Sequence, residues 1–90
     1  MATYSKIPIF SGHILADYHE YDDRVDFALI IEYGEDRVVY KTWSRKKFGQ
    51  FDPYDLPEIE PRATKLAAKF QSMGEKMFLV RLQTLKATRQ

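Results

Sequence analysis

Cysteine is absent from this 90-residue chain, and glycine and proline are scarce, with four of each. Without thiols the chain can form no disulfide and no thiolate metal site, and it offers no cysteine nucleophile. No hydrophobic run approaches the length of a membrane span, and the N-terminus leads into no apolar stretch long enough for a signal peptide. These absences predict a cytoplasmic protein that does not enter a membrane.

What the chain does contain is typical of a globular protein. Hydrophobic residues make up 44% of it and charged residues 30%, a composition too apolar for a disordered segment. Aromatic residues reach 14%, and each large ring can bury about 150–250 Å². Ninety residues provide one hydrophobic core and not two, so we expect a single α+β domain over residues 1–90.

Charge is divided unequally along the chain. Residues 1–36 contain eight acidic and two basic side chains, a net charge of −6, whereas residues 37–90 contain five acidic and twelve basic side chains, a net charge of +7. The formal total of +1 hides this division. An asymmetry of this kind is typical of a protein that binds a charged partner.

Residues 25–33 show the clearest local pattern, because apolar and other side chains alternate along them as in a strand with one buried face. Residues 34–36 predict a turn, and residues 37–43 predict the returning strand. A two-residue loop at 35–36 would place Val38, Tyr40 and Thr42 on the face of Leu29. A three-residue loop would place Val39 and Trp43 there instead. We favour the first register because it leaves Lys41 outside.

The remaining segments complete a β-β-β-α-β order. Residues 7–21 read as one long extended segment in which Gly12 indicates a bulge, and residues 44–60 read as an ordered loop. Pro61 begins a helix whose apolar stripe runs to residue 73, and Gly74 ends it. Residues 76–86 alternate again and predict a last strand. The expected fold is a small antiparallel sheet of three to four strands with one helix packed on one face, and its expected core is Phe27, Leu29, Ile31, Val38, Tyr40, Leu66, Phe70, Val80 and Leu82.

Two groups of basic residues suggest contact with nucleic acid. The first surrounds a tryptophan and comprises Lys41, Trp43, Arg45, Lys46 and Lys47. The second, Arg62, Lys65 and Lys69, forms a stripe beside the apolar stripe of the predicted helix. Clustered cations displace counterions from phosphates, and an indole ring can stack on an unpaired nucleobase. The alternative is that the cations are solvated and that the rings belong to the core, because the whole chain is far less basic than most nucleic-acid-binding domains.

A second hypothesis is a protein-binding modulator or inhibitor. Acidic side chains near the first predicted turn, together with apolar residues on the second face of the sheet, are the candidates for this role: Asp17, Glu20, Asp22, Asp23, Ile30 and Leu79. One helix covers only one face of a small sheet. The second face must therefore be covered by the loop over residues 44–60, by the long first segment, or by another chain, either a second copy in a homodimer or a target protein. Small stand-alone accessory proteins of viruses and mobile elements often have this character.

Catalytic and metal sites are not expected. His13, Asp17 and His19 recur at alternate strand positions, as zinc ligands can, but no further ligand completes a set. The serines lack a nucleophile motif, and the glycines are scattered, so no phosphate-binding loop is present. The sequence therefore predicts a non-enzymatic protein without cofactor or metal.

Overall fold

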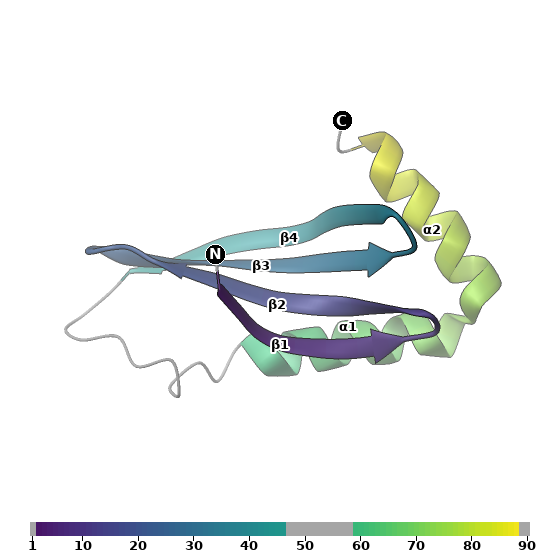
Figure 1. The fold of residues 1–90 in the computed structure, drawn as a ribbon, viewed down its shortest axis with the longest axis horizontal. Coiled ribbons are helices and arrows are strands. Elements are labelled where there is room, and N and C mark those ends of the chain that lie inside the picture. Colours follow the sequence, from purple (N-terminus) through teal and green to yellow (C-terminus); the bar gives the residue numbers. More distant parts are fainter. Residues whose placement is uncertain (1, 47–58, 89–90) are drawn as a thin grey trace.

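The computed structural model describes the backbone of residues 2–46 and 59–88, with side chains from residue 5 onward. The described residues form a four-stranded antiparallel sheet in the order β1-β2-β3-β4, followed by two helices (Figure 1). Their bounds are β1 (Ala2–Ile9), β2 (Gly12–Glu20), β3 (Arg24–Tyr33), β4 (Asp36–Lys46), α1 (Ile59–Met73) and α2 (Glu75–Thr88). The α+β class is confirmed. The predicted β-β-β-α-β order with one helix is wrong, since four strands precede two helices.

Helix α1 lies along one face of the sheet, behind the strands in Figure 1, and packs mainly on β1 and β2. Its buried side chains recur every three or four residues and point at the sheet: Ile59, Ala63, Leu66, Ala67 and Phe70. They meet inward side chains of β2 and β3, including Ile14, Leu29 and Ile31. The helical stripe expected from the sequence is therefore confirmed, and it sets the α1 face of the sheet as the main core.

The segment 7–21 is two strands and not one. A tight turn at Phe10 and Ser11 joins β1 to β2, so that Ile9 pairs with Gly12. Gly12 is therefore the first residue of β2, and the predicted bulge there is wrong. A Cβ atom at Gly12 would lie 2.4 Å from the carbonyl oxygen of Glu32, so the close approach of β3 requires glycine at this position.

The β3–β4 hairpin combines features of both predicted registers. Its turn consists of Gly34 and Glu35, and Ile31 pairs with Val38, which places Val38 in the core. A bulge follows, in which Tyr40 is the extra residue of β4, so that Lys41 pairs with Leu29. The bulge reverses the alternation along β4. Lys41 therefore lies on the α1 face of the sheet, against the expectation that it points away from it.

Residues 75–88 form α2, and the prediction of a strand over residues 76–86 is wrong. Phe78 and Leu82 are buried against α1 and the sheet, with Leu85 packed beside them, a spacing of four and three residues that lies on one side of a helix. Val80, expected in the core, is instead 56% exposed. Gly74, in the left-handed region with φ of 88°, separates α1 from α2. Neither helix of the described residues is long and apolar enough to cross a membrane.

Candidate functional site

A groove of about 350 Å³ lies between α1 and the neighbouring part of the sheet, and we call it the α1–β4 groove. It is lined by Leu29, Tyr40, Lys41, Arg62, Lys65, Leu66 and Lys69. The two leucines are buried and Tyr40 is partly buried, so these three form an apolar floor. The four cationic side chains form its rim, one from β4 and three from α1.

The position of α1 explains why the rim is cationic. Because α1 packs mainly on β1 and β2, one of its flanks faces the part of the sheet that β3 and β4 supply. Arg62, Lys65 and Lys69 are spaced three and four residues apart, so they share that flank. The bulge at Tyr40 turns Lys41 toward them from the opposite side. Two basic groups that are more than twenty residues apart in the sequence thus line one groove.

The rim cations have no carboxylate partner among the described residues. Elsewhere, ion pairs join Arg24 to Asp23 and Asp26, Arg37 to Glu32 and Asp17, and Lys86 to Asp36. No carboxylate is among the residues that line the α1–β4 groove. Its positive charge is therefore not neutralised by the described part of the chain.

Trp43 is packed beside the groove and does not line it. Its indole stacks on Phe27, with ring centroids 5.3 Å apart, and the guanidinium carbon of Arg62 lies 4.7 Å from the indole centroid. A nucleobase could stack on this indole only by displacing Phe27 or Arg62. Arg62 and Tyr40, by contrast, do line the groove. Tyr40 was expected only as a core residue.

The other predicted basic residues are not brought to the groove. Arg45 and Lys46 lie at the far end of β4, where they pair in register with Val25 and Arg24 and make further contacts of their own. Lys47 lies outside the described residues. The structure thus assembles Lys41, Arg62, Lys65 and Lys69 in one place and leaves Arg45 and Lys46 apart from them.

The residues predicted to meet a protein partner do not form one surface. Glu20, Asp22 and Asp23 lie at the β2–β3 turn, and Leu79 is 37% exposed on α2 instead of lying on a strand. Ile30 lies on the sheet face opposite α1, as expected, but it is only 3% exposed. The role of Ile30 in binding a partner stays a prediction.

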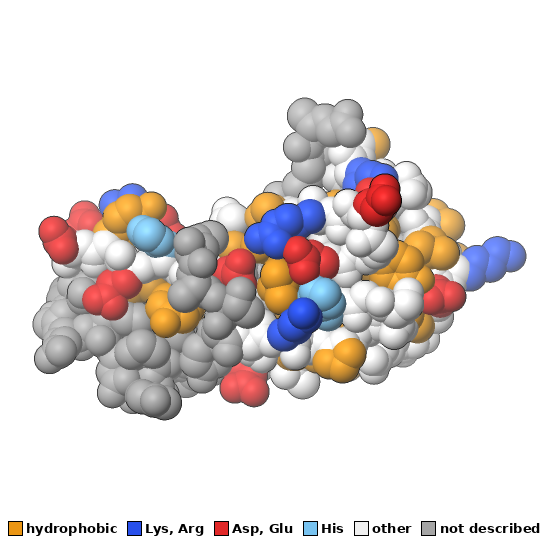
Figure 2. All heavy atoms as spheres, in the orientation of Figure 1, with side chains coloured by type: hydrophobic (Ala, Val, Ile, Leu, Met, Phe, Trp, Pro, Cys, Tyr) orange, Lys and Arg blue, Asp and Glu red, His pale blue; other side chains and the backbone are white. Residues whose placement is uncertain are grey.

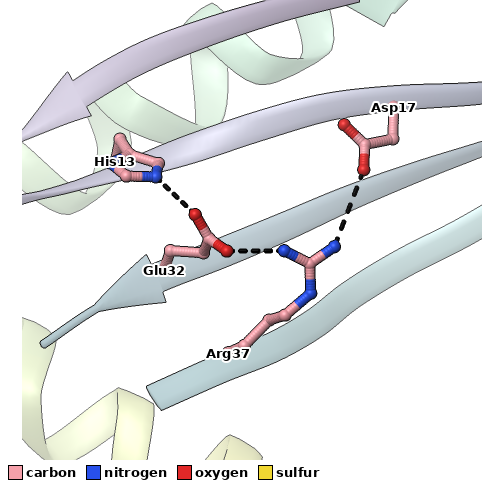
Figure 3. A network of polar contacts seen from close by, with 4 residues as sticks. All are labelled: His13, Asp17, Glu32 and Arg37. Carbon is pink, nitrogen blue, oxygen red and sulfur yellow. Dashed lines mark hydrogen bonds and ion pairs between the residues drawn. The ribbon is translucent and has the colours of Figure 1, made fainter. Parts of the chain in front are cut away.

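On that same sheet face, opposite α1, three charged side chains and a histidine contact one another. Glu32 accepts a hydrogen bond from His13 Nε2 at 2.6 Å and another from Arg37, whose guanidinium also lies 3.8 Å from the buried carboxylate of Asp17 (Figure 3). The pKa of Glu32 is lowered, mainly by the hydrogen bond from His13 and to a smaller extent by that from Arg37. Figure 2 shows acidic, basic and histidine side chains adjacent to one another on the visible face.

This network also accounts for two of the three residues considered as metal ligands. His13 is bonded to Glu32, and Asp17 faces Arg37, a cation that a metal ion would have to displace. His19 lies further along β2 with its ring 4.4 Å from that of Tyr21. In residues 2–46 and 59–88, no group of three or more potential ligands could hold a metal ion.

Comparisons of the chain with protein families, with curated proteins and with solved structures found no match. Its function must therefore be inferred from the geometry and charge of its own residues.

Proposed function

We propose that this protein is a small non-enzymatic binding module that contacts nucleic acid, alone or within a nucleoprotein complex, through the α1–β4 groove. The observation that supports the proposal is the convergence of Lys41, Arg62, Lys65 and Lys69 on one groove without a carboxylate partner in the described chain.

Cations that converge on one groove without neutralising carboxylates repel one another, and this repulsion is unfavourable for folding. A polyanion relieves this repulsion. Each of its phosphates that contacts a lysine or arginine also releases condensed counterions into solution, which favours binding further. Three of the rim cations lie in succession along α1, an arrangement that suits the repeating charge of a phosphate backbone. A phosphate backbone is therefore the partner that best matches both the sign and the linear arrangement of the groove.

The proposal is tested by a matched pair of triple variants. Lys41, Lys65 and Lys69 are changed to Ala in the first, and Lys6, Lys76 and Arg81 in the second. The control removes the same three charges from exposed positions outside the groove. Binding of fluorescein-labelled oligonucleotides is followed by anisotropy as a function of salt. The negative slope of log affinity against log salt should become shallower by about 0.7–0.9 for each phosphate that no longer contacts a cation. The expected change is about 2–3 for the groove variant.

Circular dichroism of both variants establishes that each is folded before the affinities are compared. Equal slopes for the two variants would place the binding surface outside the α1–β4 groove. Absence of any anisotropy change for the unmodified protein with single- or double-stranded DNA or RNA at low salt would refute nucleic-acid binding itself.

A second candidate function is modulation or inhibition of another protein through the acidic β2–β3 turn. The observation that favours it is the exposure of Glu20, Asp22 and Asp23 at the end of one hairpin. Complementary charge accelerates association with a basic surface. Affinity capture from cell extract with and without nuclease tests it: a protein that is retained after nuclease treatment and lost on changing Asp22 and Asp23 to Lys supports this function. Self-association also stays a prediction, for which sedimentation of the protein at high micromolar concentration is the measurement.

A further inference from the structure

The α1–β4 groove offers an apolar surface as well as charge. Leu29, Leu66 and Tyr40 form its floor, below the cationic rim. A double helix presents phosphates and sugars on its outside and keeps the flat faces of its nucleobases stacked inside. It would contact the rim and leave the partly exposed Tyr40 ring uncovered, above the buried Leu29 and Leu66. An unpaired nucleobase has a free flat face that can cover such a floor. The floor therefore favours a single strand.

The dimensions of the groove agree with this preference. Its volume of about 350 Å³ lies at the lower end of the range of about 300–1,000 Å³ that is usual for small-molecule sites. Arg62 and Lys69 are seven residues apart on α1, about 10 Å at 1.5 Å per residue. Cations thus stand at intervals along the groove, where they can meet the phosphates on either side of a nucleobase seated on the floor.

Arg62 adds a planar group at one end of the groove. Its guanidinium lies over the indole of Trp43, which is itself stacked on Phe27, and it makes no ion pair with a described carboxylate. Proteins that read single strands stack nucleobases on aromatic rings and on arginine guanidinium planes. The Phe27–Trp43–Arg62 stack restricts the guanidinium before any ligand arrives, which reduces the entropy cost of binding.

On the basis of the proposed function, we infer that the α1–β4 groove selects single-stranded over double-stranded nucleic acid. An unpaired nucleobase covers the Tyr40 ring, above the buried Leu29 and Leu66, and contacts the Arg62 guanidinium. The phosphates on either side of it contact Lys41, Lys65 and Lys69. Trp43 acts as the support of Arg62 and does not touch the nucleobase.

The test uses fluorescein-labelled dT₁₂ and rU₁₂ as single strands, a G·C-rich DNA hairpin that stays double-stranded at low salt, and the substitution Arg62→Lys. Lysine keeps the charge of residue 62 but lacks the plane. We expect the unmodified protein to bind the single strands at least about ten-fold more tightly than the duplex. Arg62→Lys should weaken single-strand binding by about five-fold or more, the lower end of the range measured when a stacking side chain is removed. The salt slope and the duplex affinity should not change.

Arg81→Lys is the matched control, because it makes the same substitution on the exposed surface of α2. Thermal unfolding of both variants separates a loss of affinity from a loss of fold. Equal affinity for single strand and duplex, or an Arg62→Lys variant that binds single strands as Arg81→Lys does, overturns the inference and leaves the proposed function standing. Failure of all three probes to bind the unmodified protein at low salt refutes the proposed function and the inference together.

Discussion

The two assignments of residues 75–88, helix and strand, make opposite predictions about Phe78 and Val80. In a strand these two side chains would point to the same face and both would be core residues. In α2 they point to different sides, so Phe78 is fully buried and Val80 is 56% exposed. Phe78→Ala and Val80→Ala are therefore a matched pair of substitutions that tests the helix directly.

Phe78 packs against three other rings, with centroid distances of 5.5 Å to Phe10, 5.1 Å to Tyr33 and 5.0 Å to Phe70. Truncating a fully buried phenylalanine to alanine costs about 3–5 kcal/mol, and the three neighbouring rings favour the upper end. A chain of this length has a free energy of unfolding of about 5–13 kcal/mol, so Phe78→Ala removes a large share of it. Val80→Ala should change stability by no more than about 0.5 kcal/mol, because it removes exposed surface and alanine is the better helix former.

Urea unfolding monitored by circular dichroism and by the fluorescence of Trp43, the only tryptophan, measures both changes. Phe78→Leu, which retains most of the buried volume, keeps the comparison informative if Phe78→Ala does not fold. We expect Val80→Ala to have the highest free energy of unfolding of the three variants, Phe78→Leu a lower one, and Phe78→Ala the lowest. A Val80→Ala variant as destabilised as Phe78→Ala would show that residues 75–88 do not pack as α2.

Two further predictions concern the sheet face opposite α1 and the β1–β2 turn. The pKa of Glu32 is lowered by His13 and Arg37, so its contribution to stability is complete above the unfolded-state pKa and disappears as the pH falls through the lowered value. Glu32→Gln should therefore reduce the loss of stability that urea unfolding shows between neutral and strongly acidic pH. An unchanged acid dependence would contradict the network. Gly12→Ala should destabilise the protein by about 1–3 kcal/mol, since the alanine Cβ would collide with the Glu32 carbonyl and the Tyr33 ring. Thermal unfolding equal to that of the unmodified protein would show that β2 and β3 are further apart at this point.

The α+β class and two elements could be predicted from the sequence because their signals are local. Alternation along residues 25–33 is a period of two, which only a strand presents to one face. The apolar residues of α1 recur with the period of a helix, and its basic stripe is visible in the same spacing. The cationic character of Lys41 and of the α1 flank, and hence a polyanion-binding hypothesis, was therefore accessible without a structure.

The type of the last element was not accessible in the same way. Phe78 and Leu82 are four residues apart, a spacing that places two side chains on one face of a strand and equally on one side of a helix. Only the packing of both rows of side chains decides between them. In the folded molecule Leu85 joins Phe78 and Leu82 against the core, and Val80 is left in solvent.

The α1–β4 groove depends on two tertiary features that have no local signal. The packing of α1 on β1 and β2 turns its basic flank toward β4, and this position follows from contacts between residues far apart in the chain. The bulge at Tyr40 then decides which face of the sheet receives Lys41. A single extra residue in a strand moves every following side chain to the opposite face. The sequence by itself determined which side chains carry the charge, whereas the tertiary structure decided which of them share a site.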